Sequence, residues 1–413
     1  MSQEIITTNN DRILNKKVLF VPDSIWGDLS GHRSSKYLVK VFNEVGAKVG
    51  IYAPKKNYTP EQEEELKGMA IYFEQKEYSY FQNIKPNLVE EEFMNVIKSF
   101  KPDIVFYMGT IKNKVTIDIC NKHDIQYSYL PLTTEYYCVK DFAGLEDGPC
   151  FECIKKPIFS PFKNKCLGSR KNIFKYLKEI TFSIKSKPRI INANKIIGYS
   201  NNQLSVLNSY GVNQEKMIQL PVFFDKDTIR DIKSSCGDYF VMAGQNITAK
   251  GWHIIPKIIK KSKNTKFKLI MRSENIASKF IKENDLNKYL DDGIIEIETY
   301  LQTHEEILNV MAKSRGVLVP SYYASTGEFY MLEALGLGKP VILFNVGIHG
   351  EIISHNENGM ISEVGDIDKF SKNIEEVNMN DALFEKLSSG AKQLFEELLS
   401  LDKFKNNIDS YFP

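Results

Sequence analysis

The sequence lacks the features that mark several classes of protein. Its 54 Lys and Arg residues nearly balance its 52 Asp and Glu residues, so no overall field draws the chain to nucleic acid. No run approaches the roughly 20 apolar residues of a membrane span, and the polar start has no apolar secretion core. Internal repeats, a serine-triad motif and a metal-binding HExxH motif are also missing. We therefore expect a cytoplasmic protein that does not bind nucleic acid.

Cysteine is scarce, with 6 in 413 residues, which does not suggest a secreted disulfide scaffold. Four of them nevertheless cluster, and these are Cys138, Cys150, Cys153 and Cys166. Four thiolates can close a tetrahedral zinc site, and the two-residue gap of the central pair suits a metal knuckle. Reduced thiols without a ligand, an iron–sulfur cluster or disulfides are the alternatives. A structural zinc ion here would order a long insertion and would not catalyse.

Short apolar runs alternate with amphipathic stretches throughout the chain, as in KVLFV at residues 17–21 and FKLIM at residues 267–271. This alternation is typical of parallel sheets that are buried on both faces. A polar, non-periodic stretch at residues 223–238 suits a linker between two such units. The sequence therefore predicts two doubly wound α/β domains whose strand ends face one crevice, where open α/β sheets bind ligands.

One strand of the second half leads into a loop that contains Thr326, Gly327 and Glu328, and a helix begins near Phe329. Unpaired backbone N–H groups and the positive dipole end at a helix start suit a diphosphate. Gly327 permits close approach of the backbone, and Glu333, one turn into the helix, can accept hydrogen bonds from two ribose hydroxyls. The alternative is an ordinary loop with Glu333 on a solvated face.

Two further loops can meet the same ligand. Gly244 follows a strand, and Lys250 lies at the start of the next helix, where its ammonium can contact phosphates from the opposite side. In the first half, Gly31 lies just before a helix, and His32 and Arg33 beside it can contact an anionic acceptor. The alternatives are simple turns with solvated charges.

At these positions the chain resembles glycosyltransferase family 4, strongly from Tyr199 onward. The matching residues are Gly244, Lys250, Gly251, Pro320, Ser321, Glu333 to Leu335, Gly338 to Val341, Gly347 to Glu351, Asn358 and Gly359. The resemblance implies a GT-B fold, with two Rossmann-like domains facing across a cleft, retention of anomeric configuration and no catalytic metal. It further implies a UDP- or GDP-sugar donor, with Lys250 on the diphosphate, the backbone of residues 326–329 cradling it, and Glu333 on the ribose.

The chain departs from the family pattern around the donor. The family has two glutamates separated by seven residues, and the first of these positions is Ser325, which would face the transferred sugar. Gln245 replaces the basic residue that follows the first glycine of the phosphate strand, so a positive charge is missing unless Arg272, His32 or Arg33 supplies it.

The third departure concerns the catalytic residues. Where the family often has His-Asp, this chain has Thr134-Glu135, and Glu135 is the substitute for placing the acceptor or the donor sugar. In a retaining transfer without a covalent intermediate, charge develops on the leaving diphosphate, so groups that stabilise it do most of the work. Lys250 and Glu135 are therefore the catalytic candidates.

The resemblance and the linker together suggest a domain plan. It consists of a polar tail (1–16), an acceptor-side domain (17–228) with a cysteine-containing insertion (about 136–190), a linker (229–236), a nucleotide-sugar-binding domain (237–395), and a C-terminal helix (396–413) that can return to the first domain. We expect sugar transfer to a saccharide or lipid-linked acceptor in surface polysaccharide biosynthesis. The main alternative is a non-catalytic GT-B subunit that binds glycan or a partner transferase. An epimerase or a phosphorylase is the third.

A basic stretch at residues 170–189 has two interpretations. Its cations are Arg170, Lys171, Lys175, Lys178, Lys185, Lys187 and Arg189, and its apolar residues at helical spacing are Ile173, Phe174, Leu177, Ile180 and Ile184. A basic amphipathic helix can lie on an anionic membrane, which would place the protein at the inner face of the membrane, beside a lipid-linked acceptor. The alternative is a surface helix whose apolar stripe is buried in its own domain.

Overall fold

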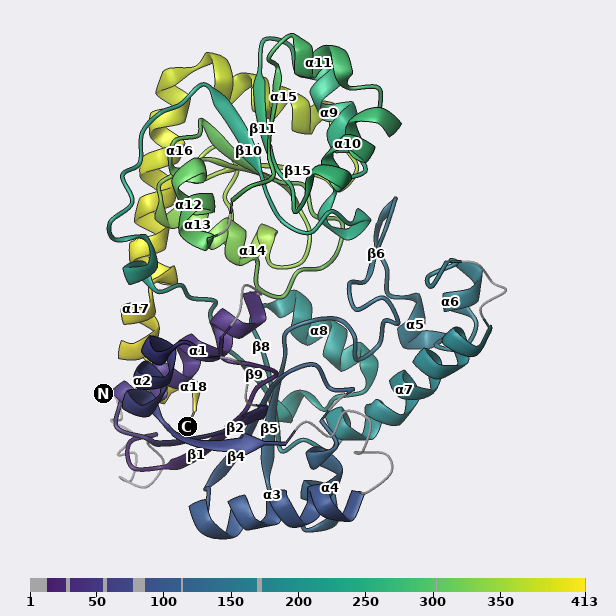
Figure 1. Ribbon diagram of the computed structural model, residues 1–413, viewed down its shortest axis with the longest axis vertical. Helices are drawn as coiled ribbons and strands as arrows, with labels where there is room; N and C mark the ends of the chain where they lie inside the picture. The colour runs from purple at the N-terminus through teal and green to yellow at the C-terminus, as the bar shows by residue number, and fades with distance from the viewer. Residues whose placement is uncertain are drawn as a thin grey trace, which may run out of the picture.

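The computed structural model describes residues 13–26, 30–54, 58–76, 86–112, 114–168, 173–301 and 303–412. Two α/β domains lie one above the other, and helices cover both faces of each sheet (Figure 1). The prediction of two doubly wound domains is confirmed. Within the described ranges, every helix is too short or too polar to cross a bilayer.

The first domain is built on a parallel sheet with the strand order β3-β2-β1-β4-β5-β8-β9. Its strands are β1 (Lys17–Val21), β2 (Lys48–Pro54), β3 (Ile71–Gln75), β4 (Ile104–Gly109), β5 (Tyr127–Pro131), β8 (Lys195–Gly198) and β9 (Met217–Gln219). Its helices are α1 (Ser30–Glu44), α2 (Pro60–Met69), α3 (Pro86–Phe100), α4 (Thr116–Lys122) and α8 (Asn201–Tyr210). The central strands are buried on both faces, which explains their continuous apolar runs.

The second domain is built on a parallel sheet with the strand order β12-β11-β10-β13-β14-β15. Its strands are β10 (Tyr239–Met242), β11 (Lys266–Ile270), β12 (Ile295–Glu298), β13 (Gly316–Val319), β14 (Val341–Phe344) and β15 (Met360–Ser362). Its helices are α9 (Ile255–Lys261), α10 (Glu274–Glu283), α11 (Asn287–Asp291), α12 (His304–Ala312), α13 (Phe329–Gly336), α14 (His349–Ile352), α15 (Ile367–Met379) and α16 (Asp381–Leu394). The strand order reverses between β10 and β13, which is where ligands bind in sheets of this kind.

An insertion between β5 and β8 projects from the side of the first domain (Figure 1). It contains a short antiparallel hairpin and three helices, β6 (Gly144–Leu145), β7 (Gly148–Pro149), α5 (Glu152–Lys155), α6 (Ser160–Lys163) and α7 (Ile173–Ile191). The hairpin points toward the second domain, whereas α7 runs along the first domain.

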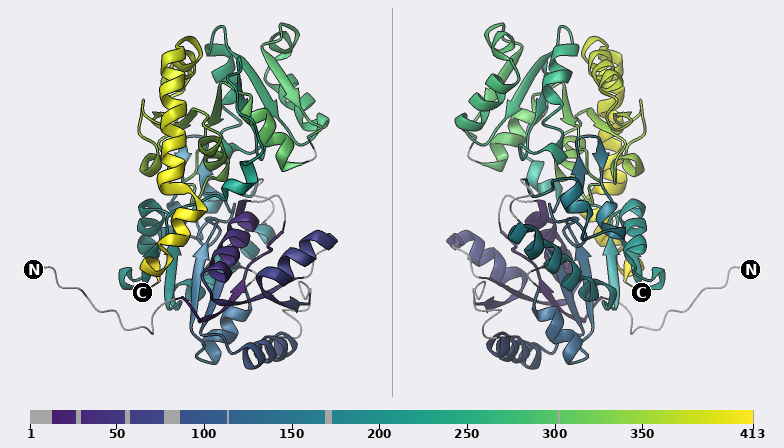
Figure 2. Two further views of the ribbon diagram at one scale, coloured as in Figure 1. Left: turned by 90° about the vertical axis from the view of Figure 1, so that its left-hand side faces the viewer. Right: turned by 90° about the vertical axis from the view of Figure 1, so that its right-hand side faces the viewer.

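The chain crosses between the domains twice, at neighbouring places. Phe224 exchanges backbone hydrogen bonds with Leu399 and Leu401, so the first crossing pairs with the return of the C-terminal segment. That segment contains a π-helical turn (Phe395–Leu399), α17 (Leu401–Asn406) and α18 (Ile408–Tyr411). It runs down one side of both domains (Figure 2). The ring of Phe404 stacks on Phe223 with 4.1 Å between centroids.

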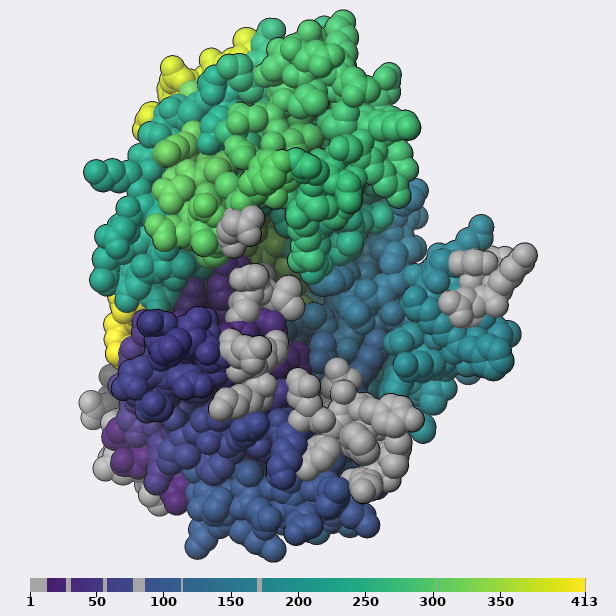
Figure 3. All heavy atoms as spheres, viewed as in Figure 1, coloured from purple at the N-terminus to yellow at the C-terminus, as the bar shows by residue number. Residues whose placement is uncertain are grey.

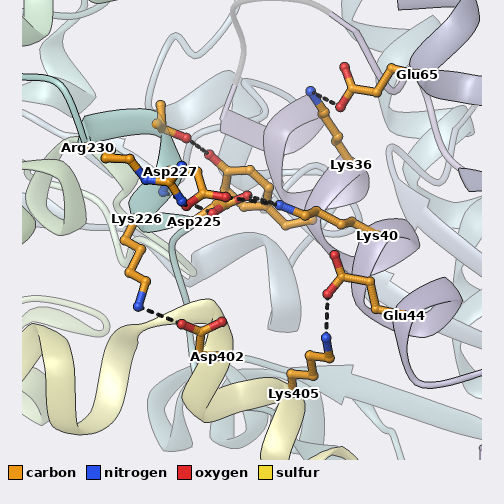
Figure 4. Close-up of polar contacts among 12 residues, drawn as sticks. Lys36, Lys40, Glu44, Glu65, Asp225, Lys226, Asp227, Arg230, Asp402 and Lys405 are labelled. Carbon is orange, nitrogen blue, oxygen red and sulfur yellow. Dashed lines mark hydrogen bonds and ion pairs between the residues drawn. The ribbon is translucent and has the colours of Figure 1, made fainter. Parts of the chain in front are cut away.

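Ion pairs surround this crossing (Figure 4). Lys40 of α1 contacts Asp225 at 2.7 Å, Lys226 contacts Asp402 at 2.7 Å, and Lys405 contacts Glu44 at 2.8 Å. Lys226 and Asp402 are about half exposed, so their pair adds little to stability. The contacts fix which surfaces of the two domains face each other.

Glu135 is a buried carboxylate that joins the ends of two neighbouring strands. It follows β5, is 3% exposed, and accepts hydrogen bonds from the backbone N–H groups of Ile111 and Lys112, which follow β4. Burial raises the pKa of this carboxyl group to about 7, although the charge of Lys112 opposes the shift. In this arrangement Glu135 organises the backbone of the first domain, and its role toward a sugar stays a prediction.

The raised pKa gives a stability prediction. Because the folded protein holds a proton that the unfolded chain releases at lower pH, the free energy of unfolding should fall as the pH rises from about 4.5 to above 7. Glu135→Gln keeps an oxygen for the two N–H groups and cannot ionise. Its stability relative to wild type should therefore increase over this range, by up to about 3 kcal/mol. Urea denaturation at a series of pH values measures the difference, and a difference that does not change with pH would contradict the assignment.

Candidate functional site

The candidate site lies where the strand order of the second sheet reverses. Residues after β10 lead to a short 3-10 turn (Thr248–Lys250), and residues after β13 lead to α13. The two loops touch, because a side chain at Gly251, which has a φ of +79°, would collide with the carbonyl oxygen of Pro320. The backbone N–H of Tyr322 also donates to the carbonyl oxygen of Ala249 at 2.8 Å. Parallel neighbours β10 and β13 thus place both loops at one edge of the sheet.

Lys250 and Glu328 form an ion pair at this edge. The lysine Nζ donates to both carboxylate oxygens, at 2.7 and 2.8 Å, and the glutamate side chain is only 5% exposed. Burial disfavours both charges, but the glutamate keeps the pKa of Lys250 above its ordinary value. Likewise burial opposes ionisation of Glu328, while Lys250 and then His349 hold its pKa below the ordinary range. Both groups are therefore charged near neutral pH, and each balances the other.

A hydrogen-bonded chain continues from this pair. Lys250 also donates to the hydroxyl of Tyr323 at 3.2 Å, and that hydroxyl donates to Ser325 Oγ at 3.3 Å. On the other side, Ser321 Oγ donates to Glu328 at 3.3 Å, and His349 Nε2 lies 4.0 Å from the same carboxylate. Sequence reasoning missed Tyr323 and His349, since only the packing of the loops after β13 and β14 brings them here.

The loop that begins at Ser325 lies between the domains. Ser325 is buried, and its carbonyl oxygen accepts a hydrogen bond from the backbone of Ile348 at 3.2 Å. The Thr326 hydroxyl donates to the carbonyl oxygen of Leu132 in the first domain at 3.1 Å. Gly327 lies against Tyr199, also in the first domain. The predicted diphosphate loop is thus covered by residues that follow β5 and β8.

A second charged group bridges the domains at α13. Arg33 of α1 lies 3.0 Å from Glu333 Oε1, and His304 Nε2 lies 3.1 Å from the same oxygen. The arginine also lies over the ring of Phe329, 5.6 Å from its centroid. The predicted acceptor-side residue Arg33 and the predicted ribose-binding residue Glu333 therefore meet directly. His304 was not predicted, because a histidine at the start of a helix gives no signal of this contact.

The contacts above do not include the other predicted residues. Gly31 lies in the first turn of α1 and faces the side chain of Leu132. His32 follows it on the same helix. Gly244 follows β10 with a φ of +122°, and Gln245 comes next. Arg272 is exposed after β11.

The insertion hairpin of the first domain reaches the Lys250 group. The ring of Phe142 packs edge-on against Tyr323, with 5.3 Å between centroids. Gly144 of β6 lies so close to Ala249 and Tyr323 that a methyl group there would be 3.2 Å from each. Tyr323, which accepts a hydrogen bond from Lys250, is thus held partly by the insertion of the first domain.

The four clustered cysteines line one cavity at the base of this hairpin, with a volume of about 10 Å³. Burial raises the pKa of all four thiols, and that of Cys138 and Cys153 to about 12, so they are protonated near neutral pH. Among the residues that the structure describes, no group of three or more His, Cys, Asp or Glu side chains is arranged to hold a metal ion. The geometry of the described residues therefore does not support the zinc prediction for Cys138, Cys150, Cys153 and Cys166. The spacing brings the four thiols to one cavity, and none of them forms a disulfide.

Comparisons with solved structures identify the fold. Sucrose-phosphate synthase from Thermosynechococcus elongatus matches with a TM-score of 0.69 at 12% identity, over 96% of this chain and 98% of that one. Anabaena HepE in complex with UDP and glucose matches with a TM-score of 0.65 at 14% identity, over 96% and 99%. A glycosyltransferase from Rickettsia africae matches with a TM-score of 0.67 at 16% identity, over 96% and 98%. The GT-B prediction is confirmed.

Sequence comparison adds a narrower result. No curated protein matches the chain. Residues 226–394, which contain Lys250, Glu328 and Glu333, match the family model of the group 1 glycosyl transferases.

Proposed function

We propose that the protein is a retaining glycosyltransferase that moves a sugar from a UDP- or GDP-sugar to a saccharide or lipid-linked acceptor in surface polysaccharide biosynthesis. The observation that carries the proposal is the position of Lys250, at the reversal point of the second sheet and beside the start of α13. Two findings support it, the match of residues 226–394 to the group 1 glycosyl transferases and the GT-B fold.

Lys250 would stabilise the negative charge that grows on the leaving diphosphate. An ammonium group has three N–H donors, and here they face the two oxygens of Glu328 and the hydroxyl of Tyr323. A diphosphate must therefore take over at least one of these contacts when it binds. Because the lysine remains charged in the buried pair, the exchange needs no change of protonation.

Glu333 would hold the ribose. Arg33 and His304 both approach Oε1, so the second carboxylate oxygen can accept a hydroxyl hydrogen bond while these contacts persist. Arg33 would then connect the ribose-binding carboxylate to the first domain and supply positive charge close to the donor, where Gln245 supplies none.

The Lys250–Glu328 pair also favours a second candidate, a GT-B subunit that binds glycan or a partner transferase without catalysis. A carboxylate that already neutralises the phosphate lysine weakens the attraction of the site for a diphosphate. The two candidates differ in one measurable property, because only the transferase must bind a nucleotide sugar.

Nucleotide binding separates these candidates. We expect a UDP- or GDP-sugar to raise the melting temperature of the wild-type protein in a screen that also includes ADP- and CMP-sugars. Glu328→Gln should bind the same donor several-fold more tightly, because it removes a competing charge. The double variant Lys250→Met with Glu328→Gln differs from it only in the lysine and should bind about 10- to 100-fold more weakly than Glu328→Gln.

Calorimetric titration measures these affinities, and Lys266→Met, which alters an exposed lysine of the same domain, is the control. Equal binding by the single and double variants would show that Lys250 does not contact the donor. No binding of any nucleotide sugar by the wild type would favour the non-catalytic subunit.

The ion pair also predicts a pattern of stability without any ligand. Lys250→Met leaves the carboxylate of Glu328 buried without a counter-ion and should lower the free energy of unfolding by about 3 kcal/mol. Adding Glu328→Gln removes the unpaired charge and should restore most of the loss. Urea denaturation of the three proteins at neutral pH tests this, and two equally unstable variants would show that the pair does not govern local stability.

A further inference from the structure

Helix α7 carries apolar residues at a spacing that is typical of a buried stripe. In the structure most of these side chains are exposed. Ile180 alone of the five lies in the interior. Phe174 is 83% exposed and Leu177 is 52% exposed, and Ile173 and Ile184 are exposed to a similar extent as Leu177. The alternative in which this stripe is covered by the helix's own domain therefore does not hold for four of its five residues.

The buried side of α7 consists of a different set of residues, Tyr176, Ile180, Ser183, Ser186 and Ile190. The ring of Tyr176 stacks on Phe162 of α6, with 4.4 Å between centroids, and its hydroxyl donates to the carbonyl oxygen of Gly168 at 3.1 Å. Because successive helical residues are about 100° apart, the exposed stripe of Ile173, Leu177 and Ile184 lies on a neighbouring face. The helix is thus fixed by one face and presents a second apolar face outward.

The exposed surface of α7 also carries cations. Lys175, Lys178, Lys185 and Lys187 are all exposed on the same helix. Its single acidic residue is Glu179, which is paired with Lys112 at 3.3 Å. At about 100° per residue, Lys178 and Lys185 lie beside Phe174, next to the exposed stripe, so the outward surface of α7 combines apolar and positively charged side chains.

The same insertion exposes further large apolar side chains. Ile158 is 50% exposed and Phe159 is 73% exposed in the turn before α6, which packs on α7 through the Phe162–Tyr176 contact. In the space-filling view the insertion stands out from the side of the first domain (Figure 3). These side chains are therefore accessible to a broad, flat surface.

We propose that the outward face of α7 is a docking surface for an anionic lipid bilayer. Apolar side chains bordered by lysines on a helix that lies in the surface plane match the chemistry of the headgroup boundary, where apolar groups enter and cations contact acidic headgroups. A second copy of the chain is a poorer occupant, since its own lysines would face these lysines. The proposal goes beyond the sugar transfer and does not depend on it.

Vesicle flotation of the full chain tests the proposal. We expect binding to vesicles that contain phosphatidylglycerol, little binding to pure phosphatidylcholine, and a marked loss of binding between about 0.1 and 0.5 M NaCl. Replacing Lys175, Lys178 and Lys185 by Gln should weaken the partition coefficient by about fivefold for each lysine. Phe174→Ser with Leu177→Ser should weaken it at least tenfold at either salt concentration.

Matched controls come from exposed residues of the second domain. Met379 is 79% exposed, and Lys279 and Lys372 are exposed lysines on α10 and α15. Met379→Ser and the Gln variants of the two lysines should float like the wild type. Melting temperatures of all variants confirm that they fold, since none of the changed side chains is buried.

Three results would overturn the proposal. The first is that the wild type does not float with anionic vesicles at low salt, and the second is that the α7 variants float as well as the wild type. The third is that light scattering shows a wild-type dimer, which Phe174→Ser with Leu177→Ser converts to a monomer. The last result would assign the face to a second copy of the chain.

Discussion

The buried ion pair between Lys250 and Glu328 is the constraint on which the rest of the site depends. The neighbouring parallel strands β10 and β13 end at this point, so the loops after them meet. Lys250 and Glu328 in these loops are largely buried, and each charge therefore needs the other as its counter-ion. Hydrogen bonds from Lys250 to Tyr323 and from Ser321 to Glu328 add to the compensation. The hairpin of the first domain then packs on Tyr323. Tyr323 therefore belongs both to the polar network around Lys250 and to one of the contacts between the domains.

The two charged groups between the domains share one property: in each of them the cation is already paired with a carboxylate. Lys250 is paired with Glu328, and Arg33 with Glu333. A ligand with a diphosphate and a ribose would therefore replace a contact of Lys250 and use the second oxygen of Glu333, and it would not enter a region of unbalanced positive charge. Its binding free energy is a difference between two sets of strong contacts, so small changes in the acids should alter affinity more than changes in distant surface charge.

The sequence was sufficient for the fold, whereas the donor site stays a prediction, and the reasons why other features could not be predicted are physical. Strand periodicity predicts buried parallel strands, and parallel strands place Lys250 near the loop of Glu328. The pairing of these side chains depends on the loops touching at Gly251, which no local pattern encodes. Cysteine spacing brought four thiols to one cavity but could not set their geometry. In α7, helical spacing identified the helix but not its buried face, because Tyr176 and two serines share that face with only two aliphatic residues, Ile180 and Ile190.

The insertion between β5 and β8 combines two different surfaces in one packed unit. Its hairpin contacts Tyr323 beside Lys250, whereas α7 turns its exposed apolar face away from both sheets. The contacts between them are continuous, since Tyr176 holds α6, and the cysteine cavity lies at the base of the hairpin. Continuity alone does not couple the two ends, because coupling requires a second arrangement that both ends favour differently. The insertion therefore fixes the orientation of the candidate site relative to the outward face of α7, and this orientation needs no conformational change.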